Sequence, residues 1–225
     1  MLIKIPDILD TSKLSNIRKI LDNAKFVDGK LSAGKHAKRI KNNEEMDQKS
    51  QQAQYLDQLV VGSLAENNTF RSAALPHKVS RPFFARYTKG MAYGDHIDDP
   101  VMGSTAGERY RTDISVTVFL NQPDDYEGGE LVINTSFGQQ KMKLPAGHAI
   151  LYPSSSLHQV TEISKGERRV AILWLQSMVR DPARRELLYN LNLARESLMQ
   201  SQPDARETAQ VDHSYVNLVR LWSEI

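Results

Sequence analysis

The hydrophobic positions of this chain follow one periodicity in its first third and another in its middle. In residues 1–75, apolar residues recur at steps of three and four, which is the spacing of one face of an α-helix. These residues are Leu14, Ile17, Ile20, Leu21, Leu56, Leu59, Val60 and Leu64. The first third is therefore predicted to be mostly helical. Residues 26–43, between the two helices, carry Gly29 and Gly34 and are expected to form an irregular or hairpin segment on the surface.

From about residue 81 to residue 177 the pattern changes to short apolar runs separated by Gly and Pro, which is typical of an all-β sandwich or barrel. In the clearest strand, 112–120, every second residue is apolar from Ile114 to Leu120, so that face is expected to cover a core. Further strands are predicted at 82–88, 130–134, 139–144, 148–152, 157–163 and 167–175. This series of strands predicts a double-sheet jelly roll.

After Ser177 the helical period returns. Residues 181–200 carry leucines among Arg and Glu, and Asp181 and Pro182 stand where a cap and a first helical residue would stand. A second helix is expected from residue 204 to the end. The predicted fold is thus α+β, with a jelly-roll core and N-terminal and C-terminal helices. We expect one domain over 1–177, helical over 1–75 with its core at about 81–177, and a helical extension over 178–225.

The composition fits an ordinary globular protein of 225 residues, 40% of them hydrophobic and 25% charged. A net charge of +2 is too small to predict a nucleic acid or an anionic membrane as partner. No stretch approaches the length of a membrane span and the N-terminus has no uninterrupted apolar run, so a cytoplasmic protein is expected. The apolar face of the C-terminal helices could pack on the core or form a homodimer interface.

Cysteine is absent from the chain. This excludes a disulfide framework, a thiolate zinc site, an iron–sulfur cluster and a cysteine nucleophile. Any metal ion must therefore be held by nitrogen and oxygen ligands.

One candidate pair of such ligands is His96 and Asp98, which follow the predicted strand 82–88 through a glycine-bearing turn. In an extended chain residues i and i+2 point the same way, so this imidazole and carboxylate can share one ion. His158, just after the turn at 153–156, is the best candidate for a third ligand. Two histidines and one carboxylate form the facial triad of non-haem Fe(II) sites. Catalytic zinc accepts the same set, so the ligands alone leave the metal open.

Arg168 stands ten residues beyond His158, at the start of the predicted strand 167–175, which we expect beside the strand that carries His158. A guanidinium can bind a carboxylate bidentately and stays charged at any working pH. Arg168 could therefore bind the distal carboxylate of a dicarboxylic co-substrate whose other end binds the metal.

Together these motifs resemble those of the Fe(II)- and 2-oxoglutarate-dependent dioxygenases of the prolyl hydroxylase superfamily. The resemblance includes the intervening residues 128–131 (GGEL) and the Pro145-x-Gly147 turn. More closely, nearly the whole chain is similar to the bacterial PKHD-type hydroxylases associated with iron uptake. That similarity runs from residues 26–29 (FVDG) through 84–87 (FARY) to 174–181 (WLQSMVRD).

The resemblance implies that His96, Asp98 and His158 bind one catalytic Fe(II) per subunit, and that Arg168 binds the distal carboxylate of 2-oxoglutarate. It also implies that Tyr87 donates a hydrogen bond to this co-substrate, although a tyrosine there could equally be core packing. The implied reaction consumes 2-oxoglutarate and O2, releases succinate and CO2, and hydroxylates a C–H bond, with L-ascorbate as a reductant. The substrate would be a small molecule or a protein side chain.

Two other functions are compatible with a jelly roll. A cupin-type metal enzyme would not use 2-oxoglutarate and would commonly show a His-x-His pair, which is absent from this sequence. A non-catalytic binding module could share the same scaffold, although the intact ligand set argues against it.

Several residues have no assigned role at this point. Arg169, adjacent to Arg168, is expected to point to the other side of the sheet and into solvent. His148 lacks a partner at ligand spacing, and the basic residues of 25–41 are expected to form a solvated face. Residues 100–111 are expected to form the lip of the pocket, with Gly103 and Gly107 as hinges.

Overall fold

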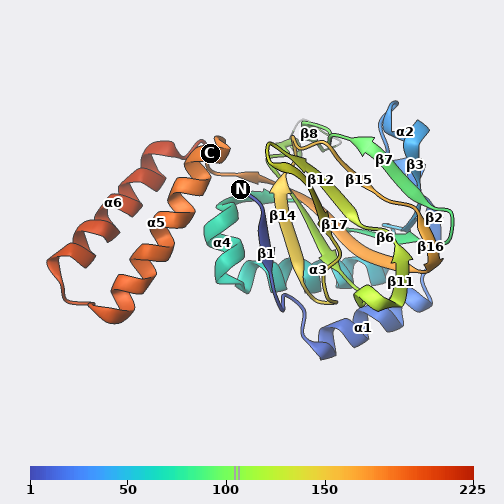
Figure 1. The fold of residues 1–225 in the computed structure, drawn as a ribbon, viewed down its shortest axis with the longest axis horizontal. Coiled ribbons are helices and arrows are strands. Elements are labelled where there is room, and N and C mark those ends of the chain that lie inside the picture. Colours follow the sequence, from blue (N-terminus) through green and yellow to red (C-terminus); the bar gives the residue numbers. More distant parts are fainter. Residues whose placement is uncertain (104, 106) are drawn as a thin grey trace.

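The centre of the molecule is a jelly roll of two β-sheets, seen in the computed structural model, which describes residues 1–103, 105 and 107–225 (Figure 1). In spatial order the large sheet contains β1 (Ile3–Ile5), β14 (Ala149–Pro153), β10 (Ile114–Phe119), β17 (Arg168–Ser177), β6 (Phe83–Tyr87), β4 (Glu44–Met46) and β2 (Phe26–Asp28), with β5 (Pro76–Val79) paired to β17. The small sheet contains β13 (Gly138–Met142), β12 (Leu131–Thr135), β15 (His158–Val160), β7 (Ala92–His96) and β3 (Lys41–Asn42). The predicted α+β jelly roll is confirmed.

Two separate apolar clusters explain why the large sheet is buried on both faces. On its outer face, β10 and β17 pack against α1 (Thr11–Asp22), α3 (Gln51–Glu66) and α4 (Asn68–Ala74) through residues such as Val116 and Leu173. On its inner face, Phe119 and Val170 pack toward the small sheet. The predicted alternation of β10 is therefore correct, but its second face is also buried. That face holds Ser115 and Thr117, which makes it available for a site.

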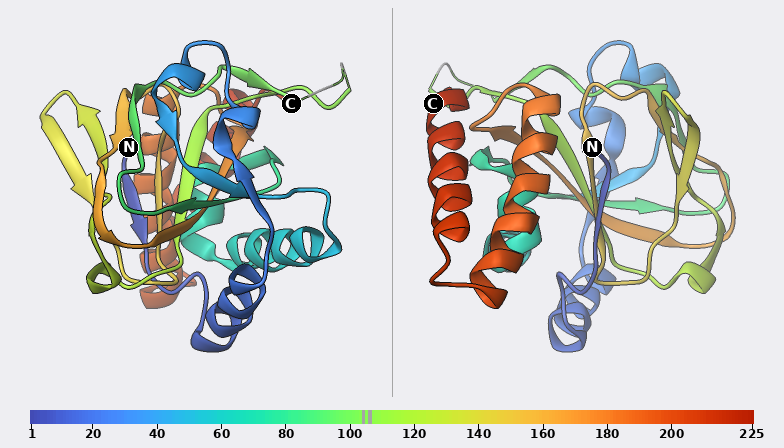
Figure 2. Two further views of the ribbon diagram at one scale, coloured as in Figure 1. Left: turned by 90° about the vertical axis from the view of Figure 1, so that its right-hand side faces the viewer. Right: turned by 60° about the vertical axis from the view of Figure 1, so that its left-hand side comes forward.

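The C-terminal helices form a hairpin that projects beside the jelly roll (Figures 1 and 2). The hairpin consists of α5 (Pro182–Ser201) and α6 (Arg206–Trp222). Asp181 caps α5 by accepting hydrogen bonds from the backbone N–H groups of Ala183 and Arg184, as the sequence predicts. A small cluster of Leu75, Val179 and Leu188 joins the base of the hairpin to the core. No helix among the described residues is long and apolar enough to cross a membrane.

The first third of the chain is mostly helical, as its periodicity predicts, but it also contains short strands. Besides α1, α3 and α4 it contributes β1 to β4, the 3-10 turn η1 (Gly29–Ser32) and α2 (Ala37–Ile40). Strands of two to four residues are too short to show a pattern in sequence, and here β2, β3 and β4 extend the edges of the two sheets. This places part of residues 26–46 against the interior instead of on the surface.

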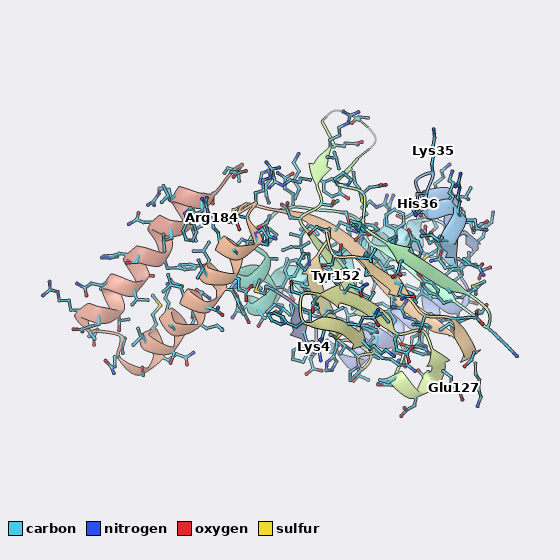
Figure 3. All side chains as sticks on the ribbon, turned by 45° about the horizontal axis from the view of Figure 1, so that its top comes forward. Lys4, Lys35, His36, Glu127, Tyr152 and Arg184 are labelled. Carbon is cyan, nitrogen blue, oxygen red and sulfur yellow. The ribbon has the colours of Figure 1, made fainter. Side chains whose placement is uncertain are left out.

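Lys41 is the clearest correction to the predicted solvated basic face. Lys30, Lys35, Lys38 and Arg39 are exposed, and Lys35 points away from the molecule (Figure 3). Lys41, in contrast, is only 8% exposed. Its buried ammonium group has two partners, since Nζ lies 2.5 Å from Glu45 Oε1 and 2.9 Å from Ser32 Oγ. A charge run in the sequence does not reveal that one of its members has a buried partner.

The remaining elements border the jelly roll. The predicted strand 157–163 is divided into β15 and β16 (Ile163–Gly166), and β16 pairs with β11 (Tyr126–Gly128) outside the two main sheets. Within the segment 100–111, β8 (Val101–Met102) and β9 (Tyr110–Arg111) pair as antiparallel strands. Residues 104 and 106 of this predicted lip lie outside the described residues.

Candidate active site

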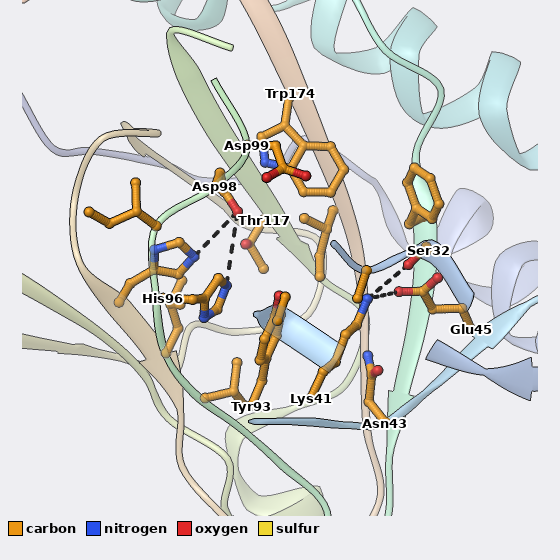
Figure 4. A pocket seen from close by; sticks show the side chains of 18 of the residues that line it. Ser32, Lys41, Asn43, Glu45, Tyr93, His96, Asp98, Asp99, Thr117 and Trp174 are labelled. Carbon is orange, nitrogen blue, oxygen red and sulfur yellow. Dashed lines mark hydrogen bonds and ion pairs between the residues drawn. The ribbon is translucent and has the colours of Figure 1, made fainter. Parts of the chain in front are cut away.

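Three side chains with metal-binding atoms converge between the two sheets. His96 ends β7, and β7 pairs with β15 so that His158 lies directly opposite His96. Asp98 follows two residues after His96, and its Oδ1 lies 3.9 Å from His96 Nε2 and 3.8 Å from His158 Nε2 (Figure 4). One ligand atom from each residue lies within 4.8 Å of the other two. The structure thus brings the three predicted ligands together, and we call this group the metal corner.

Hydrogen bonds to the backbone fix how the two imidazoles face the metal corner. His96 Nδ1 lies 2.7 Å from the Gly94 carbonyl oxygen, and His158 Nδ1 lies 2.9 Å from that of Ser156. A carbonyl only accepts, so each Nδ1 carries the proton and each Nε2 keeps a free lone pair. Burial, together with the nearby His158 imidazole, lowers the pKa of His96 to about 4. His96 is therefore neutral near pH 7, as a metal ligand must be.

The third ligand is held by two serines that sequence reasoning did not identify. Ser115 Oγ lies 2.5 Å from Asp98 Oδ2 and 2.8 Å from Ser154 Oγ. A hydroxyl has one proton and a carboxylate only accepts, so Ser115 donates to Asp98 and Ser154 donates to Ser115. Both serines are buried. The signal that could have revealed them is a pair of polar residues, Ser115 and Thr117, within a strand that is otherwise strongly apolar.

An aromatic ring completes the metal corner. Tyr93 stacks on His96 with ring centroids 3.6 Å apart and planes inclined by 13°. This contact limits rotation of the imidazole and shields it from water. Two imidazoles oriented through their Nδ1–H groups and one oriented carboxylate, with open space on the cavity side, are a donor set that fits a divalent transition-metal ion.

The cavity beside the metal corner encloses about 880 Å³ of empty space when its open mouth is included. Side chains of β17 line it from end to end, because alternate residues of a strand face the same way. Arg168 occupies the closed end, Ile172 the middle and Trp174 the mouth. At about 3.3 Å per residue, Arg168 and Trp174 are roughly 20 Å apart along the strand.

At the closed end, Arg168 is 1% exposed, and its Nε and Nη1 have no hydrogen-bond partner in the described part of the chain. Tyr87 lies opposite Arg168 in the pairing of β6 with β17, and the guanidinium carbon is 5.1 Å from the centre of its ring. The Tyr87 hydroxyl likewise finds no partner among the residues that the structure describes. We call Arg168 and Tyr87 the deep end of the cavity.

The expected neighbourhood of Arg168 is wrong in one respect. β17 belongs to the large sheet, between β10 and β6, while β15 belongs to the small sheet. The chain crosses between the sheets after β15, so Arg168 faces the cavity from the opposite wall and not from the strand beside His158. This crossing depends on long-range pairing, which the sequence pattern does not show.

Arg169 points away from the cavity, as strand alternation predicts, but it is not in solvent. Its Nη1 lies 2.6 Å from Asp22 Oδ1 and its Nε also contacts Glu167. These ion pairs leave the Arg169 side chain only 15% exposed. Its role is therefore to join α1 to the large sheet.

Comparisons with known proteins agree with this geometry. Residues 82–176 match the 2OG-Fe(II) oxygenase superfamily and residues 182–224 match the PKHD-type hydroxylase C-terminal domain. The chain is 53% identical to a PKHD-type hydroxylase of Thioalkalivibrio sulfidiphilus and 42% identical to one of Bordetella pertussis, in each case over 100% of both chains.

Solved structures give the same fold. A prolyl hydroxylase of Trichoplax adhaerens, in complex with a hypoxia inducible factor peptide fragment, has a TM-score of 0.58 and 18% identity over 78% of this chain and 83% of that chain. A prolyl-4-hydroxylase of Pseudomonas putida has a TM-score of 0.54 and 15% identity over 78% of this chain and 92% of that one.

Proposed function

The chain belongs to the PKHD-type hydroxylases of the 2OG-Fe(II) oxygenase superfamily, and on this premise we propose roles for its site residues. His96, Asp98 and His158 bind one Fe(II) per subunit. Arg168 and Tyr87 bind the distal carboxylate of 2-oxoglutarate. One observation carries this proposal: the ligand atoms converge at one part of the cavity, and at its closed end the buried Arg168 has two nitrogens, Nε and Nη1, without a hydrogen-bond partner among the described residues.

The enzyme is a 2-oxoglutarate-dependent hydroxylase. When bound, Fe(II) with 2-oxoglutarate and O2 supplies the oxidation that releases succinate and CO2 and hydroxylates a C–H bond. The protein's own contribution is orientation. The two Nδ1–H groups aim the imidazoles, Ser115 aims Asp98, and Arg168 supplies a fixed positive charge that distinguishes a dicarboxylate from a monocarboxylate. L-Ascorbate is the proposed reductant that keeps the iron in the Fe(II) state.

The Tyr87 hydroxyl is suited to donate to the co-substrate. Burial raises the pKa of Tyr87 to about 12, against the opposing effects of the Arg168 charge and the Asn43 amide. Tyr87 therefore keeps its proton at any working pH. Its unpartnered hydroxyl and the Arg168 guanidinium together supply donors to one carboxylate, which supports its role over that of plain core packing.

We place the substrate, a small molecule or a protein side chain, at the open end of the cavity. Trp174, Phe83 and Met102 line this mouth together with Asp99. Asp99 is exposed there, and we place it outside the ligand set of the metal. Met102 belongs to β8, within the segment 100–111, which supports the predicted role of that segment as the lip of the pocket.

The proposed division of the chain is a catalytic domain over 1–177 and a helical extension over 178–225. We propose that the extension forms a homodimer, since Leu187, Leu193 and Val216 are exposed apolar residues of the hairpin. A cytoplasmic location and the lack of a nucleic-acid partner stay predictions from the sequence.

The assay that tests the proposed roles is succinate formation from 2-oxoglutarate. We expect it in the purified protein only when Fe(II), 2-oxoglutarate and O2 are all supplied, and not when Zn(II) replaces Fe(II). Asp98→Ala is expected to remove it. Succinate formation at wild-type rate in Asp98→Ala would overturn the ligand assignment, and zinc-supported turnover would favour the cupin-type alternative.

A further inference from the structure

Asn43 is a buried amide that the proposed roles do not explain. It lies between β3 and β4, lines the cavity and is 3% exposed. Neither its Nδ2 nor its Oδ1 finds a hydrogen-bond partner within the described residues. Burying an amide without a partner costs free energy, so a reason for its presence is to be expected.

The side chain of Asn43 does not fasten the segment that carries it. Lys41, two residues earlier, does so by contacting Glu45 and Ser32 within the same segment. The Asn43 amide makes no such contact, and its nitrogen points into the cavity (Figure 4). A purely structural role would use the amide's hydrogen bonds, as Lys41 uses its ammonium group.

The position of Gly29 explains why the Asn43 side-chain amide keeps its orientation, with Nδ2 toward the cavity. A Cβ atom at Gly29 would lie 1.9 Å from Asn43 Oδ1, so a larger residue could not stand there without moving the amide. The Gly29 N–H also donates to the Asn43 carbonyl oxygen at 2.9 Å. The absent side chain of Gly29 thus makes room for Oδ1 and leaves Nδ2 directed at the cavity.

The amide belongs to the deep end of the cavity. Asn43 immediately precedes β4, and Glu44 of β4 pairs with Arg86 of β6, so the antiparallel register sets Asn43 level with Tyr87. Tyr87 in turn lies opposite Arg168. An amide, a phenol and a guanidinium therefore face the same end, and Asn43 Nδ2, the Tyr87 hydroxyl and Arg168 Nε and Nη1 are unpartnered among the described residues.

We propose that Asn43 Nδ2 donates a hydrogen bond to the distal carboxylate of 2-oxoglutarate, as a third donor beside Arg168 and Tyr87. This rests on the proposed function, because it assigns a further residue to the same co-substrate site. A carboxylate has about four acceptor positions, enough for all three donors. The N-terminal segment 26–46 thereby becomes part of the co-substrate site.

The test compares two ligands that differ only at the distal end. Fe(II)-loaded full-length protein is titrated by calorimetry under argon with 2-oxoglutarate and with 2-oxopentanoate, which has the same chain length but no distal carboxylate. Loss of one hydrogen bond to a charged group is expected to raise the Kd of 2-oxoglutarate about 10- to 100-fold in Asn43→Ala. The Kd of 2-oxopentanoate is expected to stay within about 2-fold.

Two further variants make the result specific. Asn42→Ala removes the neighbouring amide, which is exposed and donates to the Gly90 carbonyl oxygen, and should leave both ligands unaffected. Gly29→Ala should reproduce the selective loss by displacing Asn43 without changing an atom of the cavity-lining amide. If Asn43→Ala does not fold, the isosteric Asn43→Asp serves instead, and its negative charge should weaken 2-oxoglutarate at least as much.

Equal weakening of both ligands in Asn43→Ala would overturn the proposal and leave Asn43 a structural residue, as would unchanged binding of 2-oxoglutarate. The proposed function fails in a different way. In that case Arg168→Met, titrated in parallel, would bind 2-oxoglutarate as tightly as the wild type does. A loss in Arg168→Met without one in Asn43→Ala rejects only the role of Asn43.

Discussion

The metal corner and the deep end of the same cavity differ in how their polar atoms are satisfied. At the metal corner each imidazole Nδ1 and the second oxygen of Asp98 has a hydrogen-bond partner, and only the converging ligand atoms are left free. At the deep end, Arg168 Nε and Nη1 and the Tyr87 hydroxyl have no partner in the described chain. The first region is arranged to receive a cation, and the second to receive an anion.

The difference follows from what each ligand requires. A metal ion needs lone pairs in a fixed geometry, so the protein uses its hydrogen bonds to orient the ligands. A carboxylate needs several donors at once, so the protein leaves its donors uncommitted. A buried guanidinium with N–H groups left unpartnered is costly, which makes Arg168 poor as a purely structural residue and well suited to an anionic co-substrate.

The largest expected effect comes from removing a metal ligand. His96→Ala, Asp98→Ala and His158→Ala should each abolish Fe(II)-dependent succinate formation and leave the fold intact, because each removes one of three ligands. Iron content of the purified variants and their circular dichroism spectra measure the two effects. Tight stoichiometric iron binding with full activity in any one variant would refute the triad.

A smaller effect is expected from the serine that orients Asp98. Ser115→Ala removes the donor to Asp98 Oδ2 and should weaken metal binding about 10-fold, the lower end for a residue that supports a metal ligand. Co(II) titration followed by absorbance gives the affinity. Ser154→Ala, one hydrogen bond further from the ligand, is the graded control. An affinity loss in Ser154→Ala larger than that in Ser115→Ala would contradict the proposed chain.

A still smaller effect is expected at the mouth of the cavity, where substrate binding should reduce the mobility of residues 100–111. Residues 100–111 are expected to gain protection from hydrogen exchange when substrate binds, but not when Fe(II) or 2-oxoglutarate binds alone. Hydrogen exchange followed by mass spectrometry reports this segment. Equal protection with and without a true substrate would count against its role as a lip.

The smallest effect is expected at His148, whose side chain does not line the cavity. Its Nε2 lies 3.5 Å from Asp7 Oδ1 at the surface, and an exposed pair of this kind contributes under about 1 kcal/mol. His148→Ala should therefore match the wild type in iron content and turnover. Loss of iron from this variant would show that the ligand set is incomplete.

Much of the metal corner could be predicted because its chemistry is local in sequence. The spacing of His96 and Asp98 places both on one side of an extended chain, and His158 follows a recognisable turn. Ser115 and Asn43 could not be predicted in this way. Their roles depend on which face of a fully buried strand points inward, and on contacts between segments far apart in the chain.

The same limit explains the errors in the fold. The periodicity that revealed α1 and α3 is absent from strands as short as β3 and β4, so these strands of the first third could not be predicted. Strand parity separated Arg168 from Arg169, but it did not show that Asp22 and Glu167 would cover Arg169. It also did not show that β17 and β15 belong to opposite sheets.

The most direct test of the contrast between the two regions is a titration of succinate formation against 2-oxoglutarate in Arg168→Met and Arg169→Met. Removing the partner of a buried carboxylate costs roughly 3–5 kcal/mol, so Arg168→Met should raise the 2-oxoglutarate requirement at least about 100-fold. Arg169→Met should leave that requirement unchanged, although it removes the contact with α1. The reverse result would mean that Arg169, and not Arg168, faces the cavity, and would contradict the account of the deep end.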